Sequence, residues 1–363
     1  MRVAIYRIVI FTLILGLGLT EIGFAGTKNR PPQKPIHTMP VNAPDQLASQ
    51  LPIRSRSFDI GTAGLVPPNW PKPSRSDWTS FFASIPEYGE LYGVHSGWND
   101  KRGSDGIPET VKTSFDVTKG KPVSVYVGFG VEGDHMSQQE ADTFFQNHGA
   151  EFKRSAVAIA EKYKPGMMVI GVEANRFYEK SPKGYQDFMR IYHELYDEIK
   201  RVSPNTKVGS NFQYEYMRGA AKLTGRQHRP HWEVIQWVND KSDFVSITTY
   251  PWFDFQAPHM IPMNYYADLK QYTNKPIIIT ETGWPSQSTR IRAASEQAQI
   301  EYLKVLLIRT RSINLMGLMW VFPNDGTFGI AGGIFDYISM KRKDGSPKQV
   351  YAYWQALKSL PRK

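Results

Sequence analysis

Residues 276–286 read PIIITETGWPS, a short apolar run that leads into a glutamate, Glu281. Residues 167–177 read MMVIGVEANRF and repeat this pattern around Glu173. Short, nearly continuous apolar runs are typical of parallel strands that are buried on both faces. A carboxylate placed directly after such a strand is costly to bury unless it has a purpose. The two segments therefore predict an α/β protein in which parallel strands deliver Glu173 and Glu281 to one edge of a sheet.

The rest of the chain alternates between strand-like and helix-like patterns in the same way. Strands are expected at residues 58–65, 91–95, 123–129, 167–172, 207–212, 244–249, 276–280 and 316–321. Amphipathic helices are expected at residues 76–84, 137–162, 181–202, 230–240, 262–273 and 292–311. Eight strands interleaved with helices predict a single-domain (β/α)8 TIM barrel over residues 58–363, with an open doubly wound sheet as the alternative.

Two segments precede this barrel. Residues 1–25 combine Arg2 and Arg7 with an apolar run and a small-residue cleavage site, which is the pattern of a secretory signal peptide. An uncleaved membrane anchor is the alternative, but the apolar run is short for a span of about 20 residues. Residues 26–57 are rich in proline and basic residues and predict a flexible linker. We therefore expect an exported protein, either secreted or periplasmic, with no stable membrane insertion after cleavage.

Composition excludes several classes of protein and site. The 363 residues include 44 Lys and Arg, 34 Asp and Glu and no cysteine, so the formal net charge is +10. Without cysteine the chain has no disulfide scaffold, no cysteine nucleophile and no thiolate metal site. The positive charge is not accompanied by a recognised nucleic-acid motif, so we expect no nucleic-acid partner.

Two weaker motifs do not support a cofactor or a metal. Residues 128–133 fit a dinucleotide-binding glycine pattern, but Glu132 and Asp134 would repel a pyrophosphate. His228 and His231 are three residues apart, but a proline lies between them and no third ligand is nearby. We therefore expect neither a cofactor nor a metal ion.

In a (β/α)8 barrel, catalytic groups lie at the C-terminal ends of the strands. Polar and aromatic residues near the expected strand ends are Asp59, Thr62, His95, Trp98, Glu132, Asp134, Glu173, Asn175, Asn211, Gln213, Glu215, Tyr250, Trp252, Glu281, Trp284, Trp320 and Asp325. Two of these assignments stay open from the sequence. His95 is either part of a sugar-binding site or a hydrogen-bonded core histidine. Asn211 and Gln213 either contact a sugar or satisfy backbone groups at the barrel mouth.

The two glutamates suggest a reaction. The fourth and seventh strands of a closed barrel face each other across its mouth, so Glu173 and Glu281 could flank one scissile bond. A retaining glycosidase needs one protonated carboxyl to donate to the leaving oxygen and one ionised carboxylate to attack the anomeric carbon. The indoles of Trp252, Trp284 and Trp320 would offer faces for sugar C–H groups. The alternative is that both glutamates are surface residues that form salt bridges.

Four segments resemble the endo-β-1,3-glucanases and endo-β-1,4-galactanases of glycoside hydrolase clan A, mainly in the C-terminal part of the chain. ITETGWPS (279–286) resembles the nucleophile strand of these enzymes, and TTYPWF (248–253) resembles their sixth-strand segment. MWVFPNDGTFGI (319–330) and DGSPKQVYAYW (344–354) resemble their last strand and closing helix.

The resemblance implies a (β/α)8 fold and retaining hydrolysis of β-linked glycans. It implies that Glu281 is the nucleophile, Glu173 the acid/base and Tyr250 the hydrogen-bond partner of the nucleophile. Asn175 matches the pattern of the clan. Members usually carry asparagine immediately before the acid/base, where it binds the sugar 2-OH, but this chain has Val172 there.

We therefore expect a monomeric, exported retaining glycoside hydrolase that acts on a β-linked polysaccharide or oligosaccharide. The expected substrate-binding residues are His95, Asn175, Asn211, Gln213, Trp252, Trp284 and Trp320. One alternative is a β-glucan transglycosylase, which would use the same two glutamates and a sugar acceptor. The other is a non-catalytic glycan-binding barrel, which Val172 makes conceivable. The sequence leaves sugar identity, linkage and endo or exo action open.

Overall fold

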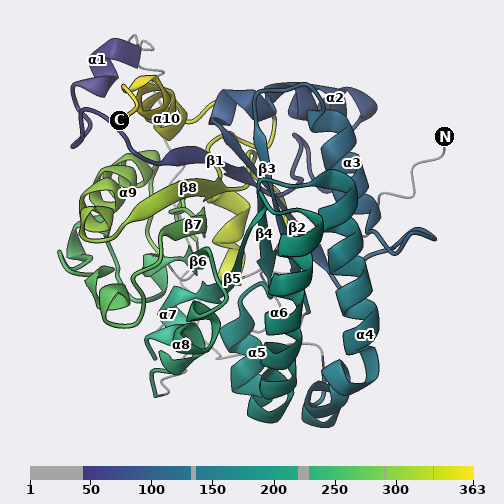
Figure 1. Ribbon diagram of the computed structural model, residues 1–363. Coiled ribbons are helices and arrows are strands. Elements are labelled where there is room, and N and C mark those ends of the chain that lie inside the picture. The colour runs from purple at the N-terminus through teal and green to yellow at the C-terminus, as the bar shows by residue number, and fades with distance from the viewer. Residues whose placement is uncertain (1–43, 132–135, 220–228, 290–291, 330) are drawn as a thin grey trace, which may run out of the picture.

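The fold is a closed barrel of eight parallel strands surrounded by helices (Figure 1). The computed structural model describes residues 44–131, 136–219, 229–289, 292–329 and 331–363. Neighbouring strands pair in sequence order, and β1 closes the ring by pairing with β8, where Asp59 lies opposite Gly317. The predicted (β/α)8 barrel is therefore confirmed, and the open doubly wound sheet is excluded.

Each predicted strand segment overlaps one observed strand, with bounds that differ by up to a few residues. The strands are β1 (Asp59–Ala63), β2 (Leu91–Gly97), β3 (Ser124–Gly130), β4 (Met167–Ile170), β5 (Lys207–Gln213), β6 (Phe244–Thr249), β7 (Ile277–Thr282) and β8 (Leu315–Val321). All residues of β4 and β7 are buried, as expected of strands covered on both faces. Glu281 lies within β7 rather than after it.

The barrel interior and the helix layer form separate cores. Seven buried residues from six strands form a small cluster, as expected of side chains that point into a barrel: Leu91, Tyr126, Met167, Val169, Phe244, Ile278 and Met319. A much larger cluster joins the outer faces of the strands to the helices. Because the interior is filled by side chains, a functional site would have to lie at an end of the barrel.

The α-helices and 3-10 helices cover the outside of the barrel. The α-helices are α1 (Pro44–Ala48), α2 (Arg75–Ser84), α3 (Glu109–Thr118), α4 (Gln138–Tyr163), α5 (Ala174–Lys180), α6 (Pro182–Val202), α7 (Tyr214–Met217), α8 (Glu233–Asn239), α9 (Glu296–Arg309) and α10 (Gln349–Ser359). The 3-10 helices are η2 (Ile85–Tyr88), η5 (Pro251–Phe253), η6 (Pro258–Met260), η7 (Ala267–Gln271), η8 (Thr310–Ser312), η9 (Ala331–Gly333) and η10 (Phe335–Tyr337).

Most predicted helices are present, and the exceptions have a local reason. The predicted capping box of Ser137 and Glu140 starts α4. The helix predicted at residues 262–273 is wrong, since only the short η7 forms there. Tyr265 and Tyr266 of this segment instead reach buried polar groups of the barrel. The helices α1, α3, α5 and α7 were not predicted. α5 and α7 have only 7 and 4 residues, which is too short to show a clear apolar period.

Residues 44–57 belong to the linker predicted over residues 26–57, but they are not a flexible linker. Residues 44–57 pack onto the barrel, where Leu47 and Leu51 are buried and α1 lies beside α10 (Figure 1). The buried guanidinium of Arg56 binds both carboxylate oxygens of Glu90. Apolar contact and charge neutralisation therefore hold a segment whose composition predicted flexibility. Residues 1–43 lie outside the described residues, so the signal peptide stays a prediction. None of the described helices is both long and apolar enough to span a bilayer.

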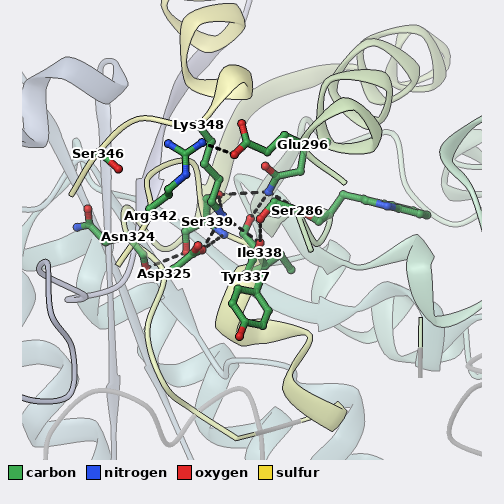
Figure 2. A network of polar contacts seen from close by, with 12 residues as sticks. Ser286, Glu296, Asn324, Asp325, Tyr337, Ile338, Ser339, Arg342, Ser346 and Lys348 are labelled. Atoms are coloured by element: carbon green, nitrogen blue, oxygen red, sulfur yellow. Dashed lines mark hydrogen bonds and ion pairs between the residues drawn. The ribbon is translucent and has the colours of Figure 1, made fainter. Parts of the chain in front are cut away.

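A buried ion pair organises the segment after β8, residues 322–348 (Figure 2). Lys348 has a side chain that is 0% exposed, and its Nζ donates to Asp325 Oδ1 at 2.7 Å and to the carbonyls of Tyr337 and Ser339. Asp325 Oδ1 also accepts a hydrogen bond from the Ser339 backbone N–H. Burial raises the pKa of Asp325 to about 6 and lowers the pKa of Lys348.

This segment also covers residues near the barrel mouth. Trp320 Nε1 donates to the carbonyl of Ile338. The Phe335 ring packs edge-on against Tyr250 and Trp252, with ring centroids 5.2 and 5.4 Å apart. The Lys348–Asp325 pair therefore supports part of the wall that surrounds the strand ends.

Replacing Lys348 with Met should lower the free energy of unfolding by about 3–5 kcal/mol, because it leaves the Asp325 carboxylate buried without its partner. The loss should be smaller at pH 5 than at pH 8, since a protonated Asp325 carries no charge. Urea unfolding followed by circular dichroism measures both effects. The double variant Lys348→Met/Asp325→Leu is the matched control and should recover most of the loss. Equal losses in the single and double variants would contradict this account of the pair.

Candidate active site

A strained turn after β4 places Glu173 at the barrel mouth. Gly171 has φ +85° and Glu173 has φ +48°, which is the left-handed region that non-glycine residues rarely adopt. The turn is held by Asn211 of β5, whose Oδ1 accepts the backbone N–H of Glu173 at 2.8 Å. The helix α5 begins at the next residue. Such strain persists only when surrounding contacts over-determine it, and it occurs most often at functional sites.

The carboxyl group of Glu173 has a separate partner for each oxygen. Thr248 Oγ1 of β6 donates to Oε1 at 2.6 Å, and Arg176 Nη1 lies 3.0 Å from Oε2. Glu173 is only 5% exposed. Burial and the negative charge of Glu281 raise the pKa of Glu173 to about 7, against the opposing charge of Arg176. The group is therefore suited to carry a proton near neutral pH.

Glu281 is also buried, but two hydrogen-bonding groups flank its carboxylate. Tyr250, the residue after β6, donates its hydroxyl to Oε2 at 2.8 Å. His95 of β2 places Nδ1 2.7 Å from Oε1. Burial and the charge of Glu281 raise the pKa of Tyr250 well above its usual value, so its phenol stays protonated as a donor. The predicted contact between Tyr250 and Glu281 is confirmed.

These contacts bring residues from four strands of the barrel together. His95, Glu173, Tyr250 and Glu281 come from β2, the turn after β4, the end of β6 and β7. The two carboxyl groups have different environments. The pKa of Glu173 is raised, whereas the carboxylate of Glu281 has two polar partners. Such a difference is the usual means of separating an acid from a nucleophile. The contact between His95 Nδ1 and Glu281 also places His95 in the site rather than in a remote part of the core.

The amides predicted to bind sugar are engaged within the protein. Asn211 donates its amide to Ser246 and Thr280 in addition to accepting from Glu173. Asn175 exchanges two hydrogen bonds with the backbone of Gln213. The side chain of Gln213 accepts from the Tyr216 N–H and donates to Glu215. In this structure Asn211, Asn175 and Gln213 shape the mouth, and a direct sugar contact by any of them stays a prediction.

The three tryptophans do not present open faces as predicted. Trp252, Trp284 and Trp320 are each 0% exposed. Trp252 stacks on Phe253 with centroids 4.2 Å apart, while Trp284 and Trp320 both pack around Tyr302. The predicted positions of these tryptophans near strand ends were correct, but strand alternation and loop packing direct their rings toward the core.

Three site neighbours were missed as functional residues. Thr248 belongs to the quoted TTYPWF segment, and Arg176 lies three residues after Glu173, which is one helical turn along α5. Glu215 was recognised only as a polar residue near a strand end. The sequence could have indicated Arg176, because a charged residue one helical turn from a candidate glutamate is a usable signal. It could not have indicated the contact from Thr248, because that contact depends on how β4 and β6 are placed in the barrel.

Other early candidates lie elsewhere. Asp59 begins β1, at the opposite end of the barrel, and pairs with Arg362. Glu132, Asp134 and His228 lie outside the described residues. In the part of the chain that the structure describes, no group of three or more His, Cys, Asp or Glu could hold a metal ion.

Val172 is buried between Glu173 and the glycines of β3. A Cβ atom built on Gly128 would lie 3.1 Å from Val172 Cγ2 and 2.7 Å from His95 Cδ2. The valine and the His95 ring therefore pack over the same glycine. The position that carries asparagine in clan A is occupied here by an apolar side chain beside the site.

Comparisons with known proteins support the fold. No protein-family model matches the chain, and no curated protein matches it. Solved structures do match. A family 39 glycoside hydrolase from Bacteroides cellulosilyticus WH2 has a TM-score of 0.53 and 17% identity, over 83% of this chain and 64% of that chain. The chain thus spans less than two thirds of that protein.

Two other matches cover most of both chains. A β-glucosidase from Exiguobacterium marinum has a TM-score of 0.59 and 12% identity, over 84% of this chain and 98% of that chain. An active-site mutant of the Rhizomucor miehei β-1,3-glucanosyltransferase, in complex with laminaritriose, has a TM-score of 0.52 and 14% identity, over 85% and 99%. At these identities the similarity shows that the barrel is of the kind found in glycoside hydrolases.

Replacing Glu173 with Gln should stabilise the protein at alkaline pH. The folded-state pKa of about 7 lies above the ordinary glutamate value of 4.5, so the stability contributed by this group is fully present below pH 4.5 and is lost as pH rises through 7. Gln mimics the protonated carboxyl and avoids a loss of up to about 3 kcal/mol. Urea unfolding should show equal stabilities at pH 4 and a more stable variant at pH 8.

The matched control is Glu179→Gln, at an exposed position on α5, the helix that begins directly after Glu173. It should leave the pH dependence of unfolding unchanged. If Glu173→Gln is less stable than the parent protein at pH 8, the elevated pKa of Glu173 is contradicted.

Proposed function

We propose that this protein is a retaining glycoside hydrolase that cleaves β-linked glycans, with Glu173 as the acid/base and Glu281 as the nucleophile. The observation that carries the proposal is the pair of buried glutamates at one barrel mouth with different partners. The pKa of Glu173 is raised to about 7, and Glu281 is flanked by Tyr250 and His95. A retaining mechanism needs this division between a proton donor and a nucleophile.

The first step would form a glycosyl-enzyme. Glu281 attacks the anomeric carbon while Glu173 gives its proton to the leaving oxygen, so the C–O bond of the glycoside breaks as the bond to Glu281 forms. The hydroxyl of Tyr250 and Nδ1 of His95 would hold the carboxylate of Glu281 for attack. Thr248 and Arg176 would orient the carboxyl of Glu173 toward the leaving oxygen.

The second step would release the sugar. Glu173, now ionised, takes a proton from water, and the water oxygen attacks the anomeric carbon and displaces Glu281. The product keeps the β configuration, and both carboxyl groups return to their starting states. If a second sugar hydroxyl replaces water, the same two steps give transglycosylation.

The proposed substrate class rests on resemblance and fold together. The segments ITETGWPS and TTYPWF resemble endo-β-1,3-glucanases and endo-β-1,4-galactanases, and one fold neighbour is a β-1,3-glucanosyltransferase in complex with laminaritriose. Both lines favour β-linked glucans or galactans. We further propose that the protein works outside the cytoplasm, secreted or periplasmic, on the basis of the signal-peptide pattern of residues 1–25.

The direct test is a screen of the protein against β-1,3-, β-1,4- and β-1,6-linked glucans and galactans. The expected result is shorter products, with the β anomer formed first by ¹H NMR. Products longer than the substrate would favour the transglycosylase. Glycan binding without turnover would instead indicate the non-catalytic barrel, and release of the α anomer would contradict a retaining mechanism.

With an activated aryl β-glycoside as the substrate, azide should distinguish the roles of the two glutamates. Glu281→Gly should be inactive until azide is added and should then give the α-glycosyl azide, because azide attacks in place of the missing carboxylate. Glu173→Gly should form the glycosyl-enzyme with this leaving group and give the β-glycosyl azide. Product configuration by NMR measures the outcome, and exchanged anomers would show that the two roles are reversed.

The activity should fall as pH rises through about 7, because Glu173 must be protonated to act as an acid. The profile of kcat/KM against pH on a natural glycan measures this alkaline limb. Arg176→Gln should move the limb to higher pH, since the guanidinium opposes the rise in the pKa of Glu173. The exposed variant Glu179→Gln is again the control. A limb that stays in place in Arg176→Gln would contradict the role of this ion pair.

A further inference from the structure

A third glutamate is buried near the same end of the barrel. Glu215 is 0% exposed and lies in the short helix α7, two residues beyond the last residue of β5. Its hydrogen bonds go to residues other than Glu173 and Glu281, and the proposed reaction does not use it. Burial raises the pKa of its carboxyl group, and the charge of Asp254 adds to this effect. A buried carboxyl group of this kind is expensive unless its hydrogen bonds serve a purpose.

Four donors surround the Glu215 carboxyl group. Thr249 Oγ1 and the Tyr265 hydroxyl donate to Oε1 at 2.7 and 2.9 Å. Gln213 Nε2 and the backbone N–H of Tyr250 donate to Oε2 at 2.7 and 2.9 Å. The carboxyl group therefore ties together the ends of β5 and β6 and the segment that contains Tyr265.

The bond to Tyr250 is the one that reaches the site. β6 ends at Thr249, and Pro251 begins η5, so Tyr250 lies where the strand ladder stops. Its N–H has Glu215 as partner, and its hydroxyl donates to Glu281 at 2.8 Å. One residue is thus fixed at its backbone by one buried glutamate and bound at its side chain to another.

We propose that Glu215 is a positioning residue: its Oε2 holds the Tyr250 backbone so that the phenol hydroxyl meets the Glu281 carboxylate. The expected effect of Glu215 on turnover rests on the proposed function. Its expected effect on the position of the Tyr250 hydroxyl does not depend on turnover. A misplaced partner of the nucleophile slows the chemical step more than substrate binding, because the hydroxyl contacts Glu281 and not the distant parts of the glycan.

The donor pattern makes Glu215→Gln a conservative variant. The Tyr250 N–H and Gln213 Nε2 can only donate, so the amide oxygen of Gln would take the place of Oε2. The amide nitrogen would then face the hydroxyls of Thr249 and Tyr265, which can accept as well as donate. Glu215→Leu instead removes every acceptor and leaves the Tyr250 N–H without its partner.

The control is Tyr265→Phe, which removes one donor to Oε1 and leaves the bond from the Tyr250 N–H to Oε2 in place. It disturbs the same cluster without touching Tyr250. If Glu215 matters only for stability, Tyr265→Phe and Glu215→Leu should both lower the melting temperature and affect kcat alike.

We expect Glu215→Gln to keep kcat within about threefold of the parent enzyme, and Glu215→Leu to lose roughly 10- to 100-fold in kcat with little change in KM. Tyr265→Phe should keep its kcat. In the double variant Glu215→Leu/Tyr250→Phe, the leucine should add less than about twofold to the loss caused by Tyr250→Phe, because both changes remove one contact. If the losses in kcat of the two single variants multiply in the double variant, or if Tyr265→Phe lowers kcat, the proposal is overturned.

Crystal structures of the Gln and Leu variants supply a measurement that needs no activity. The Tyr250 hydroxyl should stay within hydrogen-bond distance of Glu281 in Glu215→Gln and move away in Glu215→Leu. If Glu215→Leu does not fold, Glu215→Asp takes its place, since its shorter side chain withdraws the acceptor. An unmoved Tyr250 overturns the inference, whereas a moved Tyr250 in a protein that cleaves no glycan overturns only the proposed function.

Discussion

Glu173 and Glu281 are both buried at one barrel mouth, and like charges in such a place raise the cost of ionising both. In the structure, the two carboxyl groups have unequal surroundings. Burial raises the pKa of Glu173 to about 7, and Tyr250 and His95 flank Glu281. The strained backbone at Glu173 and the polar groups that support it follow from the need to keep two buried carboxyl groups close and chemically distinct.

Support for the two glutamates comes from strands that are far apart in sequence. Asn211 of β5 fixes the Glu173 backbone, Thr248 of β6 binds its carboxyl group, and His95 of β2 reaches Glu281 of β7. Closing the barrel makes these residues neighbours. The same ends of β5 and β6 provide the cluster around Glu215, so the groups that contact the glutamates are themselves held by a second set of hydrogen bonds.

Ion pairs with a buried partner recur outside the mouth. The buried guanidinium of Arg56 joins the stretch before β1 to Glu90, whose side chain is 38% exposed. Lys348 and Asp325 are both buried and join the two ends of the segment after β8. A buried pair contributes little net stability over an apolar substitute, but loss of one partner is expensive, so the Lys348–Asp325 pair selects one arrangement of this segment.

The sequence by itself determined the eight strands, the α/β class and the position of the two glutamates at strand ends, because apolar runs and the residues that end them are local properties. The local pattern also placed Asn211, Trp252 and Trp320 near the correct strand ends. Only the tertiary structure decided what these side chains touch: Asn211 binds Glu173, and the indoles pack into the core. Residue spacing specifies a face of a strand, whereas the partner on that face depends on barrel closure and on loops whose paths have no periodic signal.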